Sequence, residues 1–179
     1  MKNNNTPSAP LIIVVMGVSG CGKSTIAESL ANLLQTHFKD GDDLHPASNI
    51  EKMESGAPLS DADRIPWLVD VSRYGTEQAA LHGSCVIACS ALKRGYRDIL
   101  NQAGNVVYVF LDGSYELIAS RMRARKDHFM PETLLKSQFE ALESPQGEEN
   151  VVSVGIDKDP DNIAADAVTE LKKSGYIVG

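Results

Sequence analysis

The chain has 179 residues, a formal net charge of −7 and 42% hydrophobic residues. This size and hydrophobic content predict one globular domain with a single core. The acidic balance, without a long basic run, argues against a general affinity for nucleic acid or for acidic membranes, so a small soluble partner is expected.

Residues 1–10 are polar and contain proline, and we predict a loose tail there, neither signal peptide nor membrane anchor, before a single domain over 11–179. The chain has three cysteines. Cys85 and Cys89, on one predicted strand, would lie roughly 13 Å apart, too far for a disulfide. An odd number of unpaired thiols indicates a reducing, cytoplasmic location.

The first predicted strand, Leu11–Met16, runs directly into Gly17-Val-Ser-Gly-Cys-Gly-Lys-Ser24, which has the pattern G-x-x-x-x-G-K-[ST]. The glycines let backbone N–H groups turn toward a phosphate, Lys23 supplies charge for the β- and γ-phosphates, and Ser24 offers a hydroxyl to Mg²⁺. A chance glycine-rich turn is the alternative, but a strand precedes the motif and an amphipathic helix follows it. The residues expected to bind nucleotide here are Gly17, Val18, Ser19, Gly20, Cys21, Gly22, Lys23, Ser24 and Thr25.

Short runs rich in Val and Ile predict further buried strands near 38–39, 85–89, 106–111 and 151–154. Between and after them, apolar residues at helical spacing predict helices around residues 26–34, 115–122, 135–142 and 164–171. This alternation predicts a doubly wound α/β domain with five parallel strands and helices on both faces. Ligands of such a fold collect at the carboxyl ends of the strands.

The second predicted strand ends in a cluster containing Asp40, Asp42, Asp43 and His45. A polar turn whose aspartate caps free N–H groups is one reading. The position after the nucleotide loop's helix favours a place beside the γ-phosphate, where a carboxylate can orient or deprotonate an attacking hydroxyl. We predict that Asp42 faces the transferred hydroxyl and that Asp40 acts on the magnesium side through water.

Several blocks, in this order along the chain, together resemble the gluconokinase family. They are Asp40-Gly-Asp-Asp-Leu-His-Pro46, Asn49-Ile-Glu-Lys-Met53, Gly56-Ala-Pro-Leu-Ser-Asp61, Asp63-Arg-Ile-Pro-Trp-Leu68, Cys89-Ser-Ala-Leu-Lys-Arg-Gly-Tyr-Arg-Asp98 and His128-Phe-Met130. The resemblance covers about residues 11–142. It implies a P-loop kinase fold of the gluconate/shikimate type, with a helical substrate region over about 42–82 and normally a homodimer. The implied reaction is transfer of a phosphoryl group from ATP, with Mg²⁺, to the 6-hydroxyl of gluconate.

Gluconate offers a carboxylate and several hydroxyls, so its site needs a cation at one end and polar groups along the chain. Similarity to shikimate-type kinases assigns the carboxylate to Arg64. The alternative is a solvated helix charge paired with Asp61 or Asp63. His45 and Asn49 are candidates for hydroxyl contacts.

Trp67 is expected to pack, because gluconate has no flat ring or apolar face. Lys93 and Arg97 are four residues apart after the third predicted strand, which on a helix brings them to one side of the same cleft. They are predicted to bind substrate, with a solvated helix face as the alternative.

The densest basic segment runs over residues 121–128. Cations that complement a helix C-terminus are one explanation. Because Arg121 and Arg125 would share a helical face before a break, we predict instead a lid over about 121–131 that closes on ATP and excludes water. Arg121 is assigned to the nucleotide, Arg125 to the phosphates as a catalytic residue, and His128 to the substrate.

The third predicted strand ends without a Walker-B aspartate, so Mg²⁺ must rely on Ser24, the ATP phosphates and water, with Asp40 or Ser90 behind. Two other functions stay open. A nucleotide-dependent switch would need Asp-x-x-Gly and Asn-Lys-x-Asp motifs, which the chain lacks. A kinase for another acceptor, such as idonate, shikimate or a nucleoside monophosphate, is the closer alternative.

Overall fold

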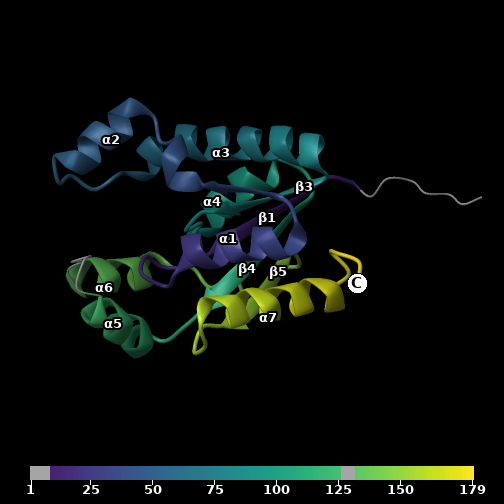
Figure 1. The fold of residues 1–179 in the computed structure, drawn as a ribbon. Helices are drawn as coiled ribbons and strands as arrows, with labels where there is room; N and C mark the ends of the chain where they lie inside the picture. Colours follow the sequence, from purple (N-terminus) through teal and green to yellow (C-terminus); the bar gives the residue numbers. More distant parts are fainter. Residues whose placement is uncertain (1–8, 126–131) are drawn as a thin grey trace, which may run out of the picture.

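The five strands form one parallel sheet in the order β2-β3-β1-β4-β5 (Figure 1). The structure is a computed structural model that describes residues 9–125 and 132–179. The strands are β1 (Leu11–Met16), β2 (His37–Asp40), β3 (Ser84–Ala88), β4 (Val106–Asp112) and β5 (Val151–Gly155). The predicted strands and their parallel arrangement are thus confirmed, with ends that move by at most one residue. Cys89, for example, follows β3 instead of ending it.

The helices alternate with the strands, as the sequence predicts. They are α1 (Lys23–Leu34), the 3-10 helix η1 (Gly41–Leu44), α2 (Ala47–Glu54), α3 (Asp61–His82), α4 (Arg94–Asn101), α5 (Tyr115–Ala124), α6 (Glu132–Ala141) and α7 (Pro160–Lys173). None of the helices in the described ranges is long and apolar enough to cross a membrane.

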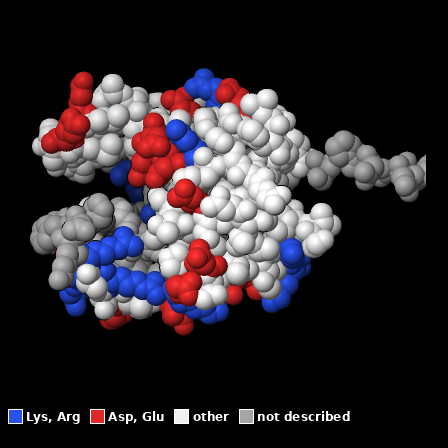
Figure 2. Space-filling model, viewed as in Figure 1, with Lys and Arg blue, Asp and Glu red and all other residues white. Residues whose placement is uncertain are grey.

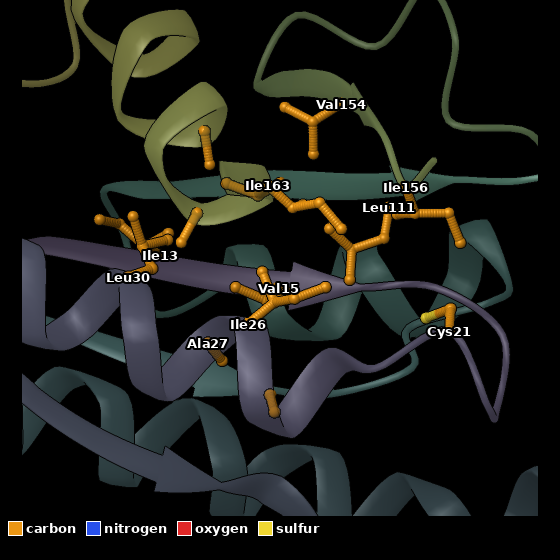
Figure 3. Close-up of a cluster of buried hydrophobic side chains, with 14 of the residues drawn as sticks. Ile13, Val15, Cys21, Ile26, Ala27, Leu30, Leu111, Val154, Ile156 and Ile163 are labelled. Carbon is orange, nitrogen blue, oxygen red and sulfur yellow. The ribbon is translucent and has the colours of Figure 1, made fainter. Parts of the chain in front are cut away.

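The sheet has a hydrophobic cluster on each face, because successive residues of β1 point to opposite sides. Ile13 and Val15 face α1 and α7, where Figure 3 shows them among side chains such as Ile26, Leu30 and Ile163. Ile12 and Val14 face the other way, toward α3 and α4. Every residue of β1 is buried, which explains its unbroken apolar run.

All five strands run in the same direction, so their carboxyl ends lie at one edge of the sheet. In Figure 1 this is the left side of the molecule, where α2, α5 and α6 project beyond the sheet. Figure 2 shows the surface hollowed between the α2 side and the α5 side of this edge. The residues that follow β1, β2 and β3 therefore meet at this edge.

Candidate active site

The glycine loop after β1 forms one wall of a cleft of about 450 Å³. Gly20 and Gly22 have φ values of +85° and +90°, in the left-handed region where glycine is favoured, and α1 begins directly afterwards. The Nζ of Lys23 donates to the carbonyl oxygen of Val18 at 3.1 Å, so the lysine lies folded across its own loop. Such a loop at a helix N-terminus is a phosphate-binding arrangement.

The predicted nucleotide residues divide between cleft and core. Val18 and Cys21 are buried, and burial raises the pKa of the Cys21 thiol, so only their backbone groups can serve a ligand. The cleft is lined by Ser19, Gly20, Gly22, Lys23, Ser24, Thr25, Asp40, Asp42, Ala88, Cys89, Ser90 and Arg125. Its volume lies within the usual range for small-molecule sites.

Asp40 connects the glycine loop to the turn that follows β2. Its Oδ2 accepts a hydrogen bond from the Ser24 hydroxyl at 2.6 Å, and its Oδ1 accepts one from the Asp42 N–H at 3.0 Å. This hydroxyl and carboxylate, side by side, are the hard oxygen groups that suit Mg²⁺ with its retained waters. Within residues 9–125 and 132–179 no group of three or more His, Cys, Asp or Glu side chains could hold a metal on its own.

Asp42 and Asp43 point to different surroundings although they are adjacent. The Asp42 side chain lines the cleft and is 81% exposed to solvent. The pKa of Asp42 is raised above its usual value, first by partial loss of solvation in the cleft and then by the nearby Asp40 carboxylate. The positive charges of Lys23 and His45 act in the opposite direction. Asp43 instead lies 3.7 Å from Lys39 at the surface. The prediction that Asp42 faces the reacting groups therefore has a geometric basis that Asp43 lacks.

His45 lies beside Asp42 and is held from behind. Its ring stacks on Trp67 with centroids 4.1 Å apart, and burial lowers its pKa. Asn49 Nδ2 contacts the ring Nδ1 at 3.2 Å and also donates to the Asp63 carbonyl at 3.0 Å, which fixes the amide orientation. The Nδ1 atom therefore accepts, and the ring proton lies on Nε2, 3.9 Å from an Asp42 oxygen.

These contacts show how Asn49 is held. The residue is buried, and its amide nitrogen is already bound to His45 and to the start of α3. The nitrogen therefore holds His45, and the contact of Asn49 with a substrate hydroxyl stays a prediction. Trp67 packs, as predicted, and its Nε1 donates to the Gly41 carbonyl at 2.8 Å.

Arg64 lies in the first turn of α3. Its Nη1 donates to the Leu59 carbonyl at 2.8 Å and makes a long contact with the Tyr96 hydroxyl at 3.4 Å. The proposed pairing with neighbouring aspartates is absent from the described residues, because Asp61 binds Lys93 and Asp63 binds Lys52. Across the described ranges no acceptor is bound to Nε or Nη2 of Arg64, so this edge can receive a carboxylate through two hydrogen bonds.

The prediction for Arg97 is wrong. Its side chain is 1% exposed, and it donates to Glu148 at 2.7 Å and to the Ala91 carbonyl at 2.7 Å. Helix α4 begins only at Arg94, and Lys93 precedes it in extended backbone. The spacing of four therefore does not bring Lys93 and Arg97 to one side, and Arg97 turns into the protein.

The basic segment is only partly described. Arg125 follows α5 in extended backbone and lines the cleft, so it does not share a helical face with Arg121. Arg121 and Arg125 nevertheless both line a second, smaller hollow beyond the glycine loop, of about 280 Å³, together with Ile26, Pro160 and Ile163. The Nη2 of Arg121 donates to the Lys158 carbonyl at 3.4 Å. His128 and the rest of the predicted lid, residues 126–131, lie outside the described residues.

Two contacts to the loop lack a signal in the sequence. Gln138 of α6 accepts hydrogen bonds from the Ser19 N–H at 3.3 Å and from its hydroxyl at 3.2 Å. Met122 of α5 packs on Gly20 so closely that a Cβ there would lie 2.7 Å from its sulfur. In the sequence, Gln138 is a polar residue between the apolar positions of its helix. Such a residue is ordinarily expected to face solvent, so the sequence does not indicate its contact with Ser19.

A larger hollow, of about 670 Å³, lies beside α4 and residues 143–150. Its lining carries both signs of charge, and its buried cation, Arg97, is already paired with Glu148. It contains none of the glycine loop. We therefore place the candidate active site at the cleft after β1 and β2.

Comparison with known proteins gives a consistent result. The family model described as shikimate kinase matches residues 19–171. The thermosensitive gluconokinase of Escherichia coli K12 is 49% identical over 152 residues, which cover 84% of this chain and 81% of that protein. The gluconokinase of Gluconobacter oxydans is 44% identical, with 91% and 92% covered.

Solved structures agree with these relatives. A gluconokinase from Sinorhizobium meliloti superimposes with a TM-score of 0.83 at 43% identity, covering 92% of this chain and 93% of that one. An APS kinase from Mycobacterium tuberculosis, at 19% identity and a TM-score of 0.67, shares the fold. The chain thus belongs to the gluconokinase family, a group of P-loop kinases of the shikimate kinase type.

Proposed function

We propose that the protein transfers the γ-phosphoryl group of ATP to the 6-hydroxyl of D-gluconate, giving 6-phosphogluconate and ADP. The observation that carries a phosphoryl transfer is the meeting of the glycine loop and the Asp42 carboxylate in one cleft. The choice of gluconate follows from the relatives, because several of them are named gluconokinases.

The loop and the basic residues act on ATP. The backbone N–H groups of residues 19–25 hold the phosphates at the N-terminus of α1. Lys23 leaves the Val18 carbonyl for the β- and γ-phosphates, Arg125 approaches the phosphates, and Arg121 lies against the nucleotide. Ser24 and Asp40 would hold Mg²⁺, which when bound neutralises charge on the phosphate oxygens.

Asp42 acts on the acceptor. Its carboxylate accepts a hydrogen bond from the 6-hydroxyl, orients the oxygen in line with the γ-phosphate and takes the proton as the bond forms. The Nε2 of His45 lies 3.9 Å from an oxygen of the same carboxylate. No covalent intermediate is needed, because positioning and electrostatic stabilisation supply most of the catalysis of this reaction.

Arg64 binds the carboxylate of gluconate through its Nε and Nη2 edge, and Lys93, which pairs with Asp61, lies against the same Tyr96 ring as Arg64. The lid over 121–131, the contact of His128 with substrate, the homodimer and the cytoplasmic location stay predictions from the sequence.

A substrate panel with coupled ADP detection tests the function. Gluconate should be phosphorylated with the highest kcat/KM among gluconate, idonate, shikimate and nucleoside monophosphates, and the product should carry its phosphate on C6. Faster turnover of any other acceptor would refute the assignment.

The anchor role of Arg64 is tested by Arg64→Lys, since an ammonium cannot make the two parallel hydrogen bonds of a guanidinium. We expect KM for gluconate to rise roughly tenfold or more and KM for ATP to change little. Arg73→Lys, on an exposed arginine of the same helix that pairs with Asp70, is the control. A defect that falls on ATP, or equally on gluconate and its neutral amide, would contradict the role.

A further inference from the structure

The N-terminal turns of α3 and α4 carry a cluster of four side chains. Asp61 and Arg64 come from the first turn of α3, and Lys93 and Tyr96 come from the residue before α4 and from its first turn. The Tyr96 ring lies close to both cations, with its centroid 5.8 Å from the Arg64 Cζ and 5.7 Å from the Lys93 Nζ. The ring is 9% exposed, so its position is fixed by packing.

The Tyr96 hydroxyl is the link in this cluster. It donates a hydrogen bond to Asp61 Oδ1 and accepts from Arg64 Nη1 at 3.4 Å. A phenol can do both at once, because it has one O–H and free lone pairs. Asp61 also accepts from Lys93 at 3.0 and 3.2 Å, so its carboxylate holds both the phenol and the ammonium.

These contacts fix the orientation of the Arg64 guanidinium group. Both N–H groups of its Nη1 have acceptors, at Leu59 and Tyr96, while the Nε and Nη2 edge has none among the described residues. A flexible arginine loses side-chain freedom when it binds a ligand, and a side chain that is already held loses less. The Asp61 carboxylate meanwhile offsets the charge of Lys93, which leaves the cluster with one net positive charge for a monoanionic acid.

We propose that Tyr96, acting with Asp61, is a positioning residue that presents the free edge of Arg64 to the carboxylate of the sugar acid. This inference rests on the proposed function, since it concerns the same carboxylate. It adds that affinity for the acid depends on a hydroxyl that itself does not touch the substrate. It also assigns Asp61 the role of counter-ion to Lys93.

Tyr96→Phe tests the proposal, because it keeps the packed ring and removes only the hydroxyl. KM for gluconate should rise about three- to tenfold, the usual effect of one lost hydrogen bond, while kcat and KM for ATP stay within about twofold. The KM of the neutral amide of gluconate should not change. Tyr74→Phe is the matched control. Tyr74 is a residue of α3 whose hydroxyl contacts His37 Nε2 at 2.6 Å. Removing this hydroxyl should leave kcat and both KM values unchanged.

A double-mutant cycle with Arg64→Lys separates the role of Tyr96 from that of Arg64. If Tyr96 acts through Arg64, Tyr96→Phe should raise KM for gluconate by a smaller factor in the Arg64→Lys background than in the wild type. If Arg64→Lys raises KM for gluconate and Tyr96→Phe has no effect on it, only the positioning role of Tyr96 is overturned. No effect of Arg64→Lys itself overturns the carboxylate anchor, and this inference with it. A Tyr96→Phe variant whose only change is a lower melting temperature also refutes the role.

Discussion

Asp40, Asp42 and Asp43 are close in sequence and make three different sets of contacts. The reason is the 3-10 helix η1, which starts after Asp40 and turns the next side chains to different directions. Asp40 caps this helix and binds Ser24, Asp42 lines the cleft, and Asp43 pairs with Lys39 on the surface. The capped turn of the first reading is therefore present, and Asp42 also lies in the cleft, where the second reading places it.

This division predicts unequal effects of two similar substitutions. Asp42→Asn should lower kcat by a factor on the order of 10²–10⁴, the range for a positioned general base, with ATP binding nearly intact. Asp43→Asn, the matched control, removes a carboxylate of the same turn and should change kcat only slightly. Steady-state kinetics and calorimetric titration with ATP measure both. Equal, small effects would show that the cluster is only a solvated turn.

At the scale of elements, the strands and most helices were predictable because each has a one-sided or unbroken apolar pattern. The run Leu11–Met16 is buried throughout, and the predicted stripe of α7 faces the sheet. Helix α4 is different, because its apolar pattern does not fix where the helix begins. Its sequence does not say that the helix starts at Arg94, so the side on which Arg97 lies could not be predicted.

The candidate site likewise has residues that the sequence predicts and contacts that it does not. The glycine loop and Asp42 were predictable, because a motif or a position after a strand determines where they lie. The contact of Gln138 was not, since it joins residues far apart in the chain: Gln138 meets Ser19 across 119 positions. Such pairs depend on how the helices pack, and a single polar residue in a helix gives no sign of its partner.

The buried ion pair between Arg97 and Glu148 should stabilise the packing of α4 against residues 143–148. Glu148→Ala removes the carboxylate that pairs with a side chain 1% exposed and leaves a buried cation without its counter-ion. The free energy of unfolding should fall by about 3 kcal/mol or more, measured by chemical denaturation. Glu140→Ala, on an exposed pair with Lys136, is the control and should cost less than about 1 kcal/mol.

The kinetics of the Glu148→Ala variant complete this test. KM for gluconate should stay within about twofold of the wild type wherever the variant is folded, because Arg97 belongs to the packing of α4 against residues 143–148. A raised KM for gluconate with unchanged stability would return Arg97 to the substrate site.

For the whole molecule, the two hydrophobic clusters lie on the faces of the sheet and the candidate site lies at its edge. The packed core therefore does not include the side chains of the cleft, apart from residues at its base such as Cys89. A protein built in this way can lose a cleft side chain and keep its fold. Ligand binding then adds stability in proportion to its affinity.

Lys23→Ala tests this separation of fold and site. Within the described part of the chain, Lys23 bonds only to a carbonyl of its own loop, so its loss should leave the melting temperature of the free protein nearly unchanged. In the wild type, ATP with Mg²⁺ at about 100 times Kd should add about 2.7 kcal/mol and raise the melting temperature by roughly 5–10 °C. The variant at the same concentration should show a clearly smaller rise, and its kcat should fall by a factor on the order of 10²–10³, as for other fixed transition-state contacts. Lys136→Ala, on an exposed lysine of α6, should behave like the wild type in both assays. A Lys23→Ala protein that is unfolded, or one that keeps the full thermal shift and near-normal turnover, would show that the lysine does not have this role.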